Sequence, residues 1–448
     1  MQKGLSRELT NRHVQMIAIG GAIGTGLFLG SGMAIQKSGP AIILAYLLAG
    51  IFCFFMMRAI GELILSDLNK SSFIEFVSEY LGEKWEFLVG WTYWLCWESL
   101  AMADLTASGI YIKYWFPQIP QWLTALVIII VLLLFNLLSV GAFGELETWF
   151  SSIKILAIVA LIVTGIILLL TSAKIGGEVV SLHNLVKNGG FFPKGMKGFV
   201  LAMPMVLFAF TGIEMVGLTS GETANPKKDL PKAINTLPLR IGLFYIGSMF
   251  VLMCIHPWNE IAVSTSPFVQ VFSSLGIKIA AGVINFVVLT AALSACNSAI
   301  FSTSRTLFVL SRNKHAAKRF GEVNNRSIPV ASLVFSSLIL FVIVILNYVL
   351  PHQIFEIISG VSTVSFILVW IILVVCHLKY KQAHPKVNVG FPMPFYPVAN
   401  ILTIIFFSGV LLLLLLDFST SLALLFTALW LGVLLLIYHG LAKKQGEV

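Results

Sequence analysis

The chain has 448 residues, of which 58% are hydrophobic and only 11% charged, with a formal net charge of +9. A mean hydropathy of +0.93 excludes a soluble globular protein, because a surface in water needs many more polar residues. The sequence is therefore that of an integral membrane protein, in which basic residues report topology rather than a nucleic-acid partner.

Apolar segments of about 18 to 25 residues, the length that crosses a hydrocarbon core of about 30 Å as a helix, recur along the whole chain. Uninterrupted runs such as the six leucines Leu411 to Leu416 favour helices over the alternating strands of a barrel. The eighth segment is long and is expected to continue past the membrane. The twelve predicted spans are 14–36, 41–65, 87–112, 122–140, 148–171, 198–219, 236–257, 269–303, 330–349, 354–376, 397–416 and 420–440.

Basic residues are distributed unequally between the two sides of these spans. If residues 1–13 are cytoplasmic, seven of the 29 Lys and Arg residues lie on the outer side and the other 22 on the inner side. Because cytoplasmic loops are enriched in Lys and Arg, both the tail 1–13 and the tail 441–448 are predicted to be cytoplasmic. The predicted location is the inner (plasma) membrane of the cell, and we expect the lipid bilayer but no nucleic acid and no obligate protein partner.

Cysteine and histidine spacing gives no sign of a cofactor. The five cysteines lie in five different spans without a CxxC pair, which predicts free, buried thiols. The eight histidines are dispersed, so no metal site is predicted. The cysteines are Cys53, Cys96, Cys254, Cys296 and Cys376.

The first predicted span contains six glycines in thirteen residues, Gly20 to Gly32, "GGAIGTGLFLGSG". Non-helical backbone is tolerated in lipid only where it is buried in protein or lines a watery cavity. A break here would aim the free N–H groups of one half-helix and the carbonyls of the other at one place, which suits a zwitterion. Two alternatives remain open, namely close packing of an intact helix through small residues and a simple kink. A nucleotide-binding loop is disfavoured because no strand precedes it.

A second interrupted segment, "PMVLFAFTGIEMVG" from Pro204 to Gly217, lies five spans later. Matching interruptions in two halves are typical of transporters built from inverted repeats, with the substrate site between them. We therefore predict an all-α membrane protein of twelve helices with discontinuous helices 1 and 6. Its repeats are predicted at 14–171 and 198–376, followed by two peripheral helices within 397–440.

Several motifs in chain order resemble those of the bacterial amino acid transporter family, within the amino acid/polyamine/organocation superfamily. The resemblance covers nearly the whole chain and implies the five-plus-five fold, proton-coupled uptake and alternating access. The motifs are "IGGAIGTGLFLGSG", "RAIGEL", "GWTYW", "FGELETWFSSIKI", "GGFFPKG", "FAFTGIEMVGLTSGETANPKKDLPKAI" and "NSAIFSTSR".

The resemblance also implies where a substrate binds. The first interrupted segment would receive its carboxylate and ammonium groups, and the sixth would supply facing backbone. Phe208 aligns with a gating aromatic of the superfamily, with a core aromatic as the alternative. The implied substrate-binding residues are Ala22, Ile23, Gly24, Thr25, Gly26, Phe208, Ala209, Thr211, Gly212 and Asp104.

Ionisable residues inside the spans are costly and point to function by default. On the resemblance, Lys154 and Glu214 are the predicted proton-coupling residues. The alternatives are a lysine that reaches the aqueous surface and a carboxylate that only bonds the broken backbone. Asp104 is predicted either to face the cavity or to form an interhelical hydrogen bond. Glu98 is expected either to belong to a local polar network or to favour a substrate with a cationic side chain.

Other charged residues are predicted to be structural. Arg58 and Glu62 are one helical turn apart and are expected to form an ion pair. Glu145 and Glu147 are assigned to the short inner loop before the fifth span. Glu222 lies in a polar linker between the repeats, with a role in an inner gate as the alternative.

The pattern as a whole predicts a secondary active transporter rather than an enzyme. We expect it to import L-amino acids, preferably neutral zwitterions, by proton symport, with the proton as coupling ion and no other cofactor. A cationic amino acid or γ-aminobutyrate permease, or an exchanger of the same fold, is the alternative. Neither a nucleophile with its base nor the repeated polar lining of a channel is visible in the sequence.

Overall fold

The fold is described from a computed structural model of the chain. The residues that it describes are 16, 23–70, 72–138, 140–175, 177–218, 225–263, 265–276, 278–351 and 353–445. Ala22 and Glu222, two of the predicted site residues, lie outside this set.

Helices make up most of the described chain. The only regular strands in these ranges, β1 (Lys174–Ile175) and β2 (Glu178–Val179), pair as a short antiparallel hairpin. The α-helices are α2 (Ser31–Ser38), α3 (Ile42–Ser66), α4 (Ile74–Leu81), α5 (Glu83–Ile112), α6 (Gln121–Asn136), α7 (Val140–Leu170), α8 (Gly195–Phe208), α9 (Met215–Leu218), α10 (Pro226–Asn235), α11 (Leu237–Arg240), α12 (Ser248–Ile255), α13 (Pro267–Ser274), α14 (Lys278–Arg312), α15 (Val330–Ile339), α16 (Phe341–Val349), α17 (Ile354–Ala383), α18 (Val398–Leu413) and α19 (Phe418–Gln445). Shorter or wider turns are η1 (Gly26–Gly30), η2 (Gly39–Ala41), η3 (Leu182–Leu185), η5 (Ile241–Gly247), η6 (Trp258–Glu260), η7 (Lys318–Gly321) and η8 (Leu414–Leu416).

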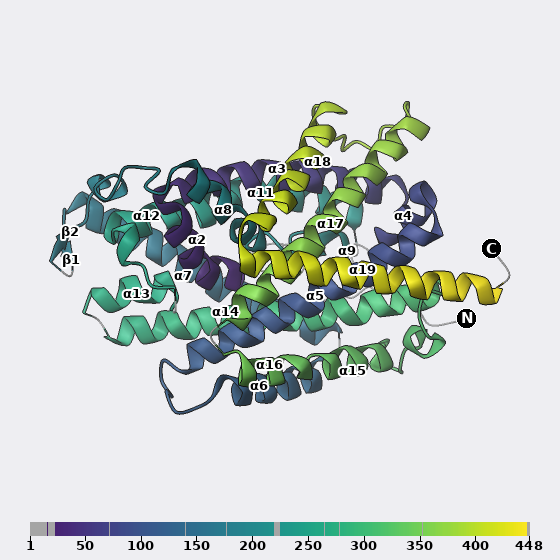
Figure 1. Cartoon of the computed structure of the whole chain (residues 1–448), viewed down its shortest axis with the longest axis horizontal. Helices are drawn as coiled ribbons and strands as arrows, with labels where there is room; N and C mark the ends of the chain where they lie inside the picture. The colour runs from purple at the N-terminus through teal and green to yellow at the C-terminus, as the bar shows by residue number, and fades with distance from the viewer. Residues whose placement is uncertain are drawn as a thin grey trace.

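The helices form an elongated bundle around two long central ones. α5 and α14 run side by side along the long axis, and α17 packs against α5. In Figure 1, α6, α15 and α16 form the lower edge and α19 crosses the front of the bundle. The β1–β2 hairpin lies at the end opposite to the C-terminal end of α19. Most side chains of α5 are buried by these neighbours, so this helix can carry polar groups away from lipid.

The membrane-spanning character of the sequence is confirmed. Within the described residues, eight helical segments are long and apolar enough to cross a bilayer, and α6 and α8 are shorter apolar helices. The second predicted span, 41–65, corresponds closely to α3. The protein is therefore a multi-pass membrane protein.

One predicted span has the wrong start. The eighth span was expected as one helix from residue 269, but α13 ends at Ser274 and α14 begins only at Lys278, with Gly276 at φ +75° between them. An L side chain rarely adopts this φ, so the chain turns there. The fifth span, predicted at 148–171, agrees with the apolar segment Glu147–Leu170, but α7 itself begins earlier, at Val140, and so includes Glu147.

The sixth span is interrupted, as its sequence predicts. α8 ends at Phe208 and α9 begins at Met215, and Gly212 between them has φ +91°. In the first span, Ile23 and Gly24 are non-helical and the wide turn η1 leads into α2. Each segment therefore has irregular backbone in a membrane helix, which requires burial in the surrounding protein.

Candidate functional site

The two interrupted segments are in direct backbone contact. A Cβ atom added to Gly26 would lie 2.5 Å from the Ala209 Cα and 2.9 Å from the Ala209 nitrogen, a spacing that only glycine allows. Ala209 is held from the other side, since its carbonyl accepts a 2.8 Å hydrogen bond from the Tyr245 hydroxyl on η5. The residues predicted to face each other across the site, Gly26 and Ala209, are thus brought together.

At the start of η1 the N–H groups of Leu27 and Phe28 both donate to the Gly24 carbonyl, at 3.2 and 3.3 Å, and a helix start carries partial positive charge. The turn after α8 is closed by short-range bonds, including Thr211 N to the Phe208 carbonyl at 3.1 Å. The Thr211 hydroxyl donates to the same carbonyl at 2.7 Å. The start of η1 and the turn after α8 therefore meet in one buried region, where the partial positive charge of the helix start suits a carboxylate.

Asp104 on α5 joins this region through the first segment. Its Oδ1 accepts a 2.6 Å hydrogen bond from the Thr25 hydroxyl, and Asp104 is fully buried. The interhelical hydrogen bond that the sequence left as one alternative is therefore present. The second oxygen, Oδ2, has no hydrogen-bond partner among the described residues, so one acceptor beside Thr25 remains available.

Glu214 lies in the turn between α8 and α9 and is fully buried. The Tyr93 hydroxyl on α5 donates to its Oε1 at 3.4 Å, and the Trp370 indole N–H on α17 donates to its Oε2 at 3.2 Å. Both partners are neutral donors from other helices. The carboxylate thus ties the sixth segment to α5 and α17.

Lys154 has an acidic partner that the sequence analysis misassigned. Glu147 is not a loop residue, because it lies on α7 two turns before Lys154 and is buried like it. Lys154 Nζ is 3.8 Å from Glu147 Oε1 and donates to the Ser294 hydroxyl of α14 at 2.9 Å. That hydroxyl lies 2.7 and 2.8 Å from the two Glu147 oxygens and donates to them. A continuous hydrogen-bonded chain therefore runs from lysine through serine to glutamate.

A cavity of about 520 Å³ lies on the side of the site that faces the loops after α5 and α12. Met33 of α2 and Phe355 of α17 belong to its lining. The Phe355 ring meets the Phe208 ring edge to face, with centroids 6.1 Å apart. Phe208 thus lies where this cavity approaches the interrupted segments. Its lining residues are Met33, Ile110, Tyr111, Lys113, Tyr114, Gln121, Val263, Thr265, Ser266, Val269, Asn285, Pro351 and Phe355.

Ion pairs on the same side hold α2, the part of the first segment that follows η1. Lys37, in the last turn of α2, lies 3.1 Å from Glu356 of α17 and 3.1 Å from Asp417 after η8. Gln36 donates to the carbonyls of Trp258 and Ile261 at 3.1 and 2.6 Å. α2 is therefore linked to α17 and to the loop after α12 by polar contacts that can be exchanged.

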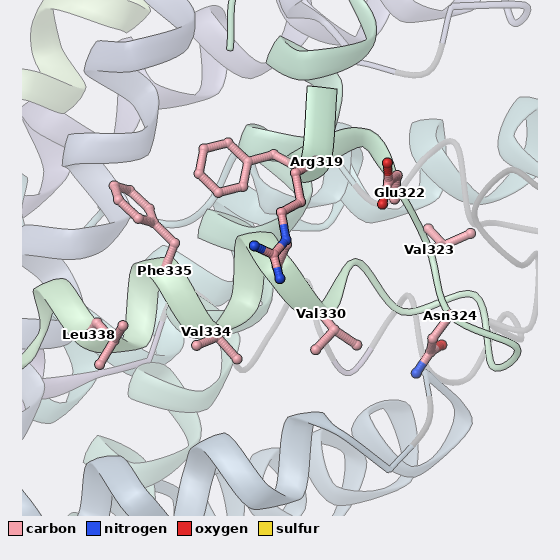
Figure 2. A pocket seen from close by; sticks show the side chains of 10 residues that line it. Arg319, Glu322, Val323, Asn324, Val330, Val334, Phe335 and Leu338 are labelled. Atoms are coloured by element: carbon pink, nitrogen blue, oxygen red, sulfur yellow. The ribbon is translucent and has the colours of Figure 1, made fainter. Parts of the chain in front are cut away.

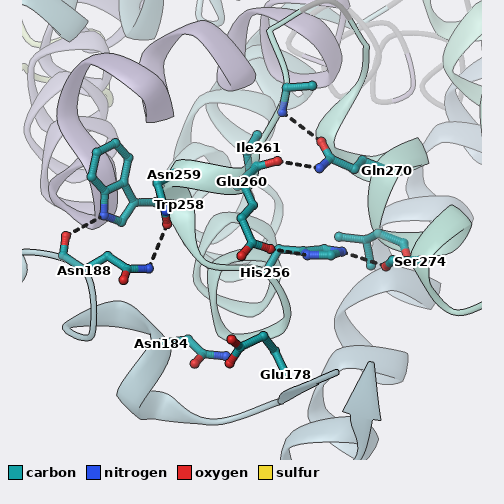
Figure 3. A network of polar contacts seen from close by, with 12 residues as sticks. Glu178, Asn184, Asn188, His256, Trp258, Asn259, Glu260, Ile261, Gln270 and Ser274 are labelled. Carbon is teal, nitrogen blue, oxygen red and sulfur yellow. Dashed lines mark hydrogen bonds and ion pairs between the residues drawn. The ribbon is translucent and has the colours of Figure 1, made fainter. Parts of the chain in front are cut away.

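Figure 3 shows how that loop is held together. The Trp258 indole donates to the Asn188 carbonyl at 2.9 Å, and Gln270 donates to the Glu260 carbonyl at 2.7 Å. The His256 ring lies between Ser274 Oγ, 2.6 Å from Nε2, and Glu260 Oε2, 3.8 Å from Nδ1. Burial lowers the pKa of His256, and the Glu260 carboxylate opposes this only in part.

Glu98 lies on another face of α5 than Asp104. It is buried on α5, and neither of its carboxylate oxygens has a hydrogen-bond partner among the described residues. Glu98 precedes Asp104 by six positions on α5, so the two side chains leave the helix in directions that differ by about 240° around its axis.

The expected ion pair between Arg58 and Glu62 is also wrong. Among the contacts of the described residues, Glu62 bonds Lys381 Nζ and the His377 ring, both at 2.9 Å, together with the backbone N–H of Met393. Arg58 donates to Asn235 Oδ1 at 2.8 Å and to the Pro392 carbonyl. Each of the two residues, although one helical turn from the other, is therefore bonded by groups from α17, α10 or the segment before α18.

Another cavity of about 520 Å³ lies between η7 and α15, where the Arg319 side chain points over Val330 and Val334 (Figure 2). It shares no lining residue with the interrupted segments and holds Glu322 as well as Arg319. We therefore do not count it as part of the candidate site.

Sequence reasoning missed four residues that contact the predicted ones, namely Glu147, Ser294, Tyr93 and Trp370. A signal existed only for Glu147, because residues seven apart lie on the same helix face as Lys154. The others come from helices distant in sequence, so their proximity depends on the fold.

Comparison with known proteins relates this architecture to one family. A family model described as amino acid permease matches residues 13–446. The chain is 53% identical over 450 residues to the amino-acid permease AapA of Bacillus subtilis (strain 168), and this match covers 100% of the chain and 97% of AapA. It is 44% identical over 449 residues to the D-serine/D-alanine/glycine transporter of Escherichia coli (strain K12), with 99% and 96% covered. It is 40% identical over 432 residues to the aromatic amino acid transport protein AroP of Shigella flexneri, with 96% and 94% covered.

Proposed function

The chain belongs to the amino acid permease family, and we propose that it is a secondary active transporter that imports neutral L-amino acids by proton symport. The observation that carries this proposal is the backbone contact between Gly26 and Ala209. It brings the start of η1 next to the turn after α8, in a buried position that suits a carboxylate and an ammonium group. The substrate would contact residues 22–26 and 208–212 and lie beside Asp104.

A neutral side chain is supported by the chemistry around this receptor. The backbone groups recognise only what all amino acids share, so side-chain selection must come from the surrounding helices. The relatives named above include transporters of D-serine, D-alanine and glycine and of aromatic amino acids. Ala209 and Thr211 are small and leave room for a side chain.

Proton coupling is supported by the two buried charged groups near the interrupted segments. The chain from Lys154 through Ser294 to Glu147 offers a donor, a hydroxyl relay and an acceptor in line. Glu214 sits in the sixth-segment turn itself, so a change in its protonation would alter its bonds to α5 and α17. Each group would stabilise one conformation when protonated and another when not.

Alternating access is supported by the contacts on the cavity side. The Phe208–Phe355 ring contact and the ion pairs of Lys37 would close this side when formed and open it when broken. We propose that the two repeats are 14–171 and 198–376, that both termini are cytoplasmic, and that the protein resides in the plasma membrane.

The experiment is uptake of a labelled neutral amino acid into proteoliposomes that contain the purified protein. An inward proton gradient should drive accumulation above the outside concentration, and competition by each of the twenty amino acids should identify the substrate. Accumulation that requires an amino acid inside and ignores the pH gradient would contradict symport and support an exchanger. Competition by lysine and arginine alone would contradict a neutral substrate.

Glu214→Gln tests the coupling separately from binding. We expect it to bind substrate but to lose gradient-driven accumulation, because the amide keeps the shape of the side chain but cannot take up a proton. Glu178→Gln on the exposed hairpin strand β2 is the matched control and should accumulate like the wild type. Unchanged uphill uptake by Glu214→Gln would remove this residue from the mechanism.

Glu98 supports the alternative of a cationic substrate, because its two carboxylate oxygens have no hydrogen-bond partner in the described part of the chain and would need a cation or a proton. If a cationic side chain reaches it, Glu98→Ala should reduce uptake of cationic amino acids and leave neutral ones unchanged. Equal effects on both classes would exclude such a role.

A further inference from the structure

A cavity of about 570 Å³ lies on the outer surface of the bundle between α3, the α11–η5 segment and the chain before α18. Its walls are apolar except at one end, where Arg58 lies. Leu47, Ile51 and Phe395 are among the exposed hydrophobic residues of the protein, so this groove is open to lipid. The lining residues are Leu47, Gly50, Ile51, Phe54, Phe55, Arg58, Pro238, Ile241, Gly242, Ile246, Pro394 and Phe395.

The groove follows α3 for the length of one acyl chain. From Arg58 to Leu47 the helix contains eleven steps, which rise about 16 Å at about 1.5 Å per residue. Half of a hydrocarbon core of about 30 Å is about 15 Å. An acyl chain whose head group lies at Arg58 would therefore extend along α3 as far as Leu47.

Arg58 supplies a positive charge that the described protein does not neutralise by direct contact. Its hydrogen-bond acceptors, Asn235 Oδ1 and the Pro392 carbonyl, are neutral, and its guanidinium carbon lies 3.7 Å from the centre of the Phe391 ring. Its Nε is buried without a hydrogen-bond partner among the described residues. The nearby carboxylate of Glu62 is already bonded to Lys381.

The charged end of the groove lies at a basic part of the molecule. Asn235, which accepts from Arg58, is the last residue of α10, and that helix carries Lys227, Lys228 and Lys232. A phosphate group suits an arginine in this setting, because the guanidinium can donate to two oxygens at once. Clusters of basic residues beside a membrane helix favour anionic lipids.

We propose that this groove binds one anionic phospholipid, with its phosphate at Arg58 and one acyl chain along α3 between Phe54 and Leu47. The lipid would bridge α3, η5 and the segment around Pro394, three parts of the chain that are distant in sequence. Binding of this kind does not depend on which solute the protein transports.

The test is native mass spectrometry of the full-length protein in detergent, titrated with dioleoylphosphatidylglycerol or with dioleoylphosphatidylcholine. We expect the first phosphatidylglycerol molecule to bind more tightly than the first phosphatidylcholine molecule. Arg58→Gln should weaken phosphatidylglycerol about tenfold, the size of effect expected for one lost charge-assisted contact. It should leave phosphatidylcholine unchanged, and Arg58→Lys should restore part of the loss.

A second variant tests the groove without touching the contacts of Arg58. A Cβ atom on Gly242 would meet no atom within 4 Å, so Gly242→Leu fills the groove without a clash at that atom. It should weaken both lipids, whereas Gly432→Leu, at an equally open site on α19, should weaken neither.

Three results would overturn the proposal. Equal affinity of the wild type for the two lipids would show that Arg58 does not select an anionic head group. Unchanged phosphatidylglycerol binding by Gly242→Leu would show that the tight lipid lies elsewhere. A lower oligomeric state of Gly242→Leu than of the wild type, with unchanged lipid binding, would show that a second copy of the chain covers the groove.

Discussion

Gly26 is the position where a single added methyl group tests the candidate site most directly. The Cβ of an alanine there would lie 2.5 Å from the Ala209 Cα, whereas carbon atoms in contact are normally about 3.5 to 4.0 Å apart. The obstacle is backbone, which cannot rotate away as a side chain can. We therefore expect Gly26→Ala to push η1 and the turn after α8 apart by about 1 Å.

The expected effect on transport is large and the effect on stability moderate. A displacement of about 1 Å between reacting groups can reduce activity about 10²-fold, and we expect a similar loss in the uptake rate at low substrate. Overpacking of a buried contact costs about 1 to 3 kcal/mol of stability, so the protein should still be purified in folded form. Initial uptake rates in proteoliposomes and the thermal unfolding of purified protein measure the two effects.

Gly24→Ala is the comparison variant in the same segment, because the substrate contacts proposed for Gly24 are backbone groups, which an alanine keeps. Its Cβ would meet the Ala295 Cβ at 3.5 Å, an ordinary van der Waals distance, so uptake should stay within a few-fold of the wild type. Normal uptake and affinity in a folded Gly26→Ala protein would refute the reasoning. An equal loss in both variants would show that any bulk in the segment is harmful and that the contact with Ala209 is not decisive.

Three further outcomes follow from other contacts. In Gly32→Ala the new Cβ would lie 3.0 Å from the Ala262 carbonyl oxygen, so we expect a lower unfolding temperature with an unchanged KM for uptake. Glu147→Gln leaves the buried Lys154 ammonium without its acid, which should cost about 3 to 5 kcal/mol and abolish gradient-driven uptake. The double variant Glu147→Gln with Lys154→Met should regain stability but not uptake, because no unpaired charge is left buried. A Glu147→Gln variant as stable as the wild type would contradict the pairing of Glu147 with Lys154. Because burial lowers the pKa of His256 in the folded protein, its protonation favours the unfolded chain. The contribution of neutral His256 to the free energy of unfolding should be fully present above about pH 6.5 and should be lost as the pH falls through the lower pKa of the folded state. The unfolding temperature of His256→Gln should not show this pH-dependent loss.

Hydrophobic length was a reliable guide to most of the fold, because a segment that crosses lipid must be apolar over nearly its whole length. The second span, 41–65, agrees with α3 to within one residue at each end. Where helices extend beyond lipid the same criterion fails, since polar residues there no longer cost energy. This is why α7 begins eight residues before the predicted span at residue 148 and why Glu147 was assigned to a loop.

Partner choice among buried polar groups was beyond the sequence. Arg58 and Glu62 are neighbours on one helix, yet each is bonded by groups from other helices. Lys154 could be singled out because an ammonium inside a membrane span is costly. Its bond to Ser294, 140 residues away, exists only because α7 packs against α14.

The sequence by itself determined that the chain is a membrane protein, that its first and sixth spans are interrupted by glycine, and that a few charged residues lie within the spans. These properties follow from local composition, because lipid penalises every polar group and every broken helix. Only the tertiary structure decided that Gly26 rests on Ala209, that Thr25 bonds Asp104 and that Ser294 bonds Lys154. Those pairs depend on how the helices pack, since their geometry is set by side chains that lie far apart in the sequence.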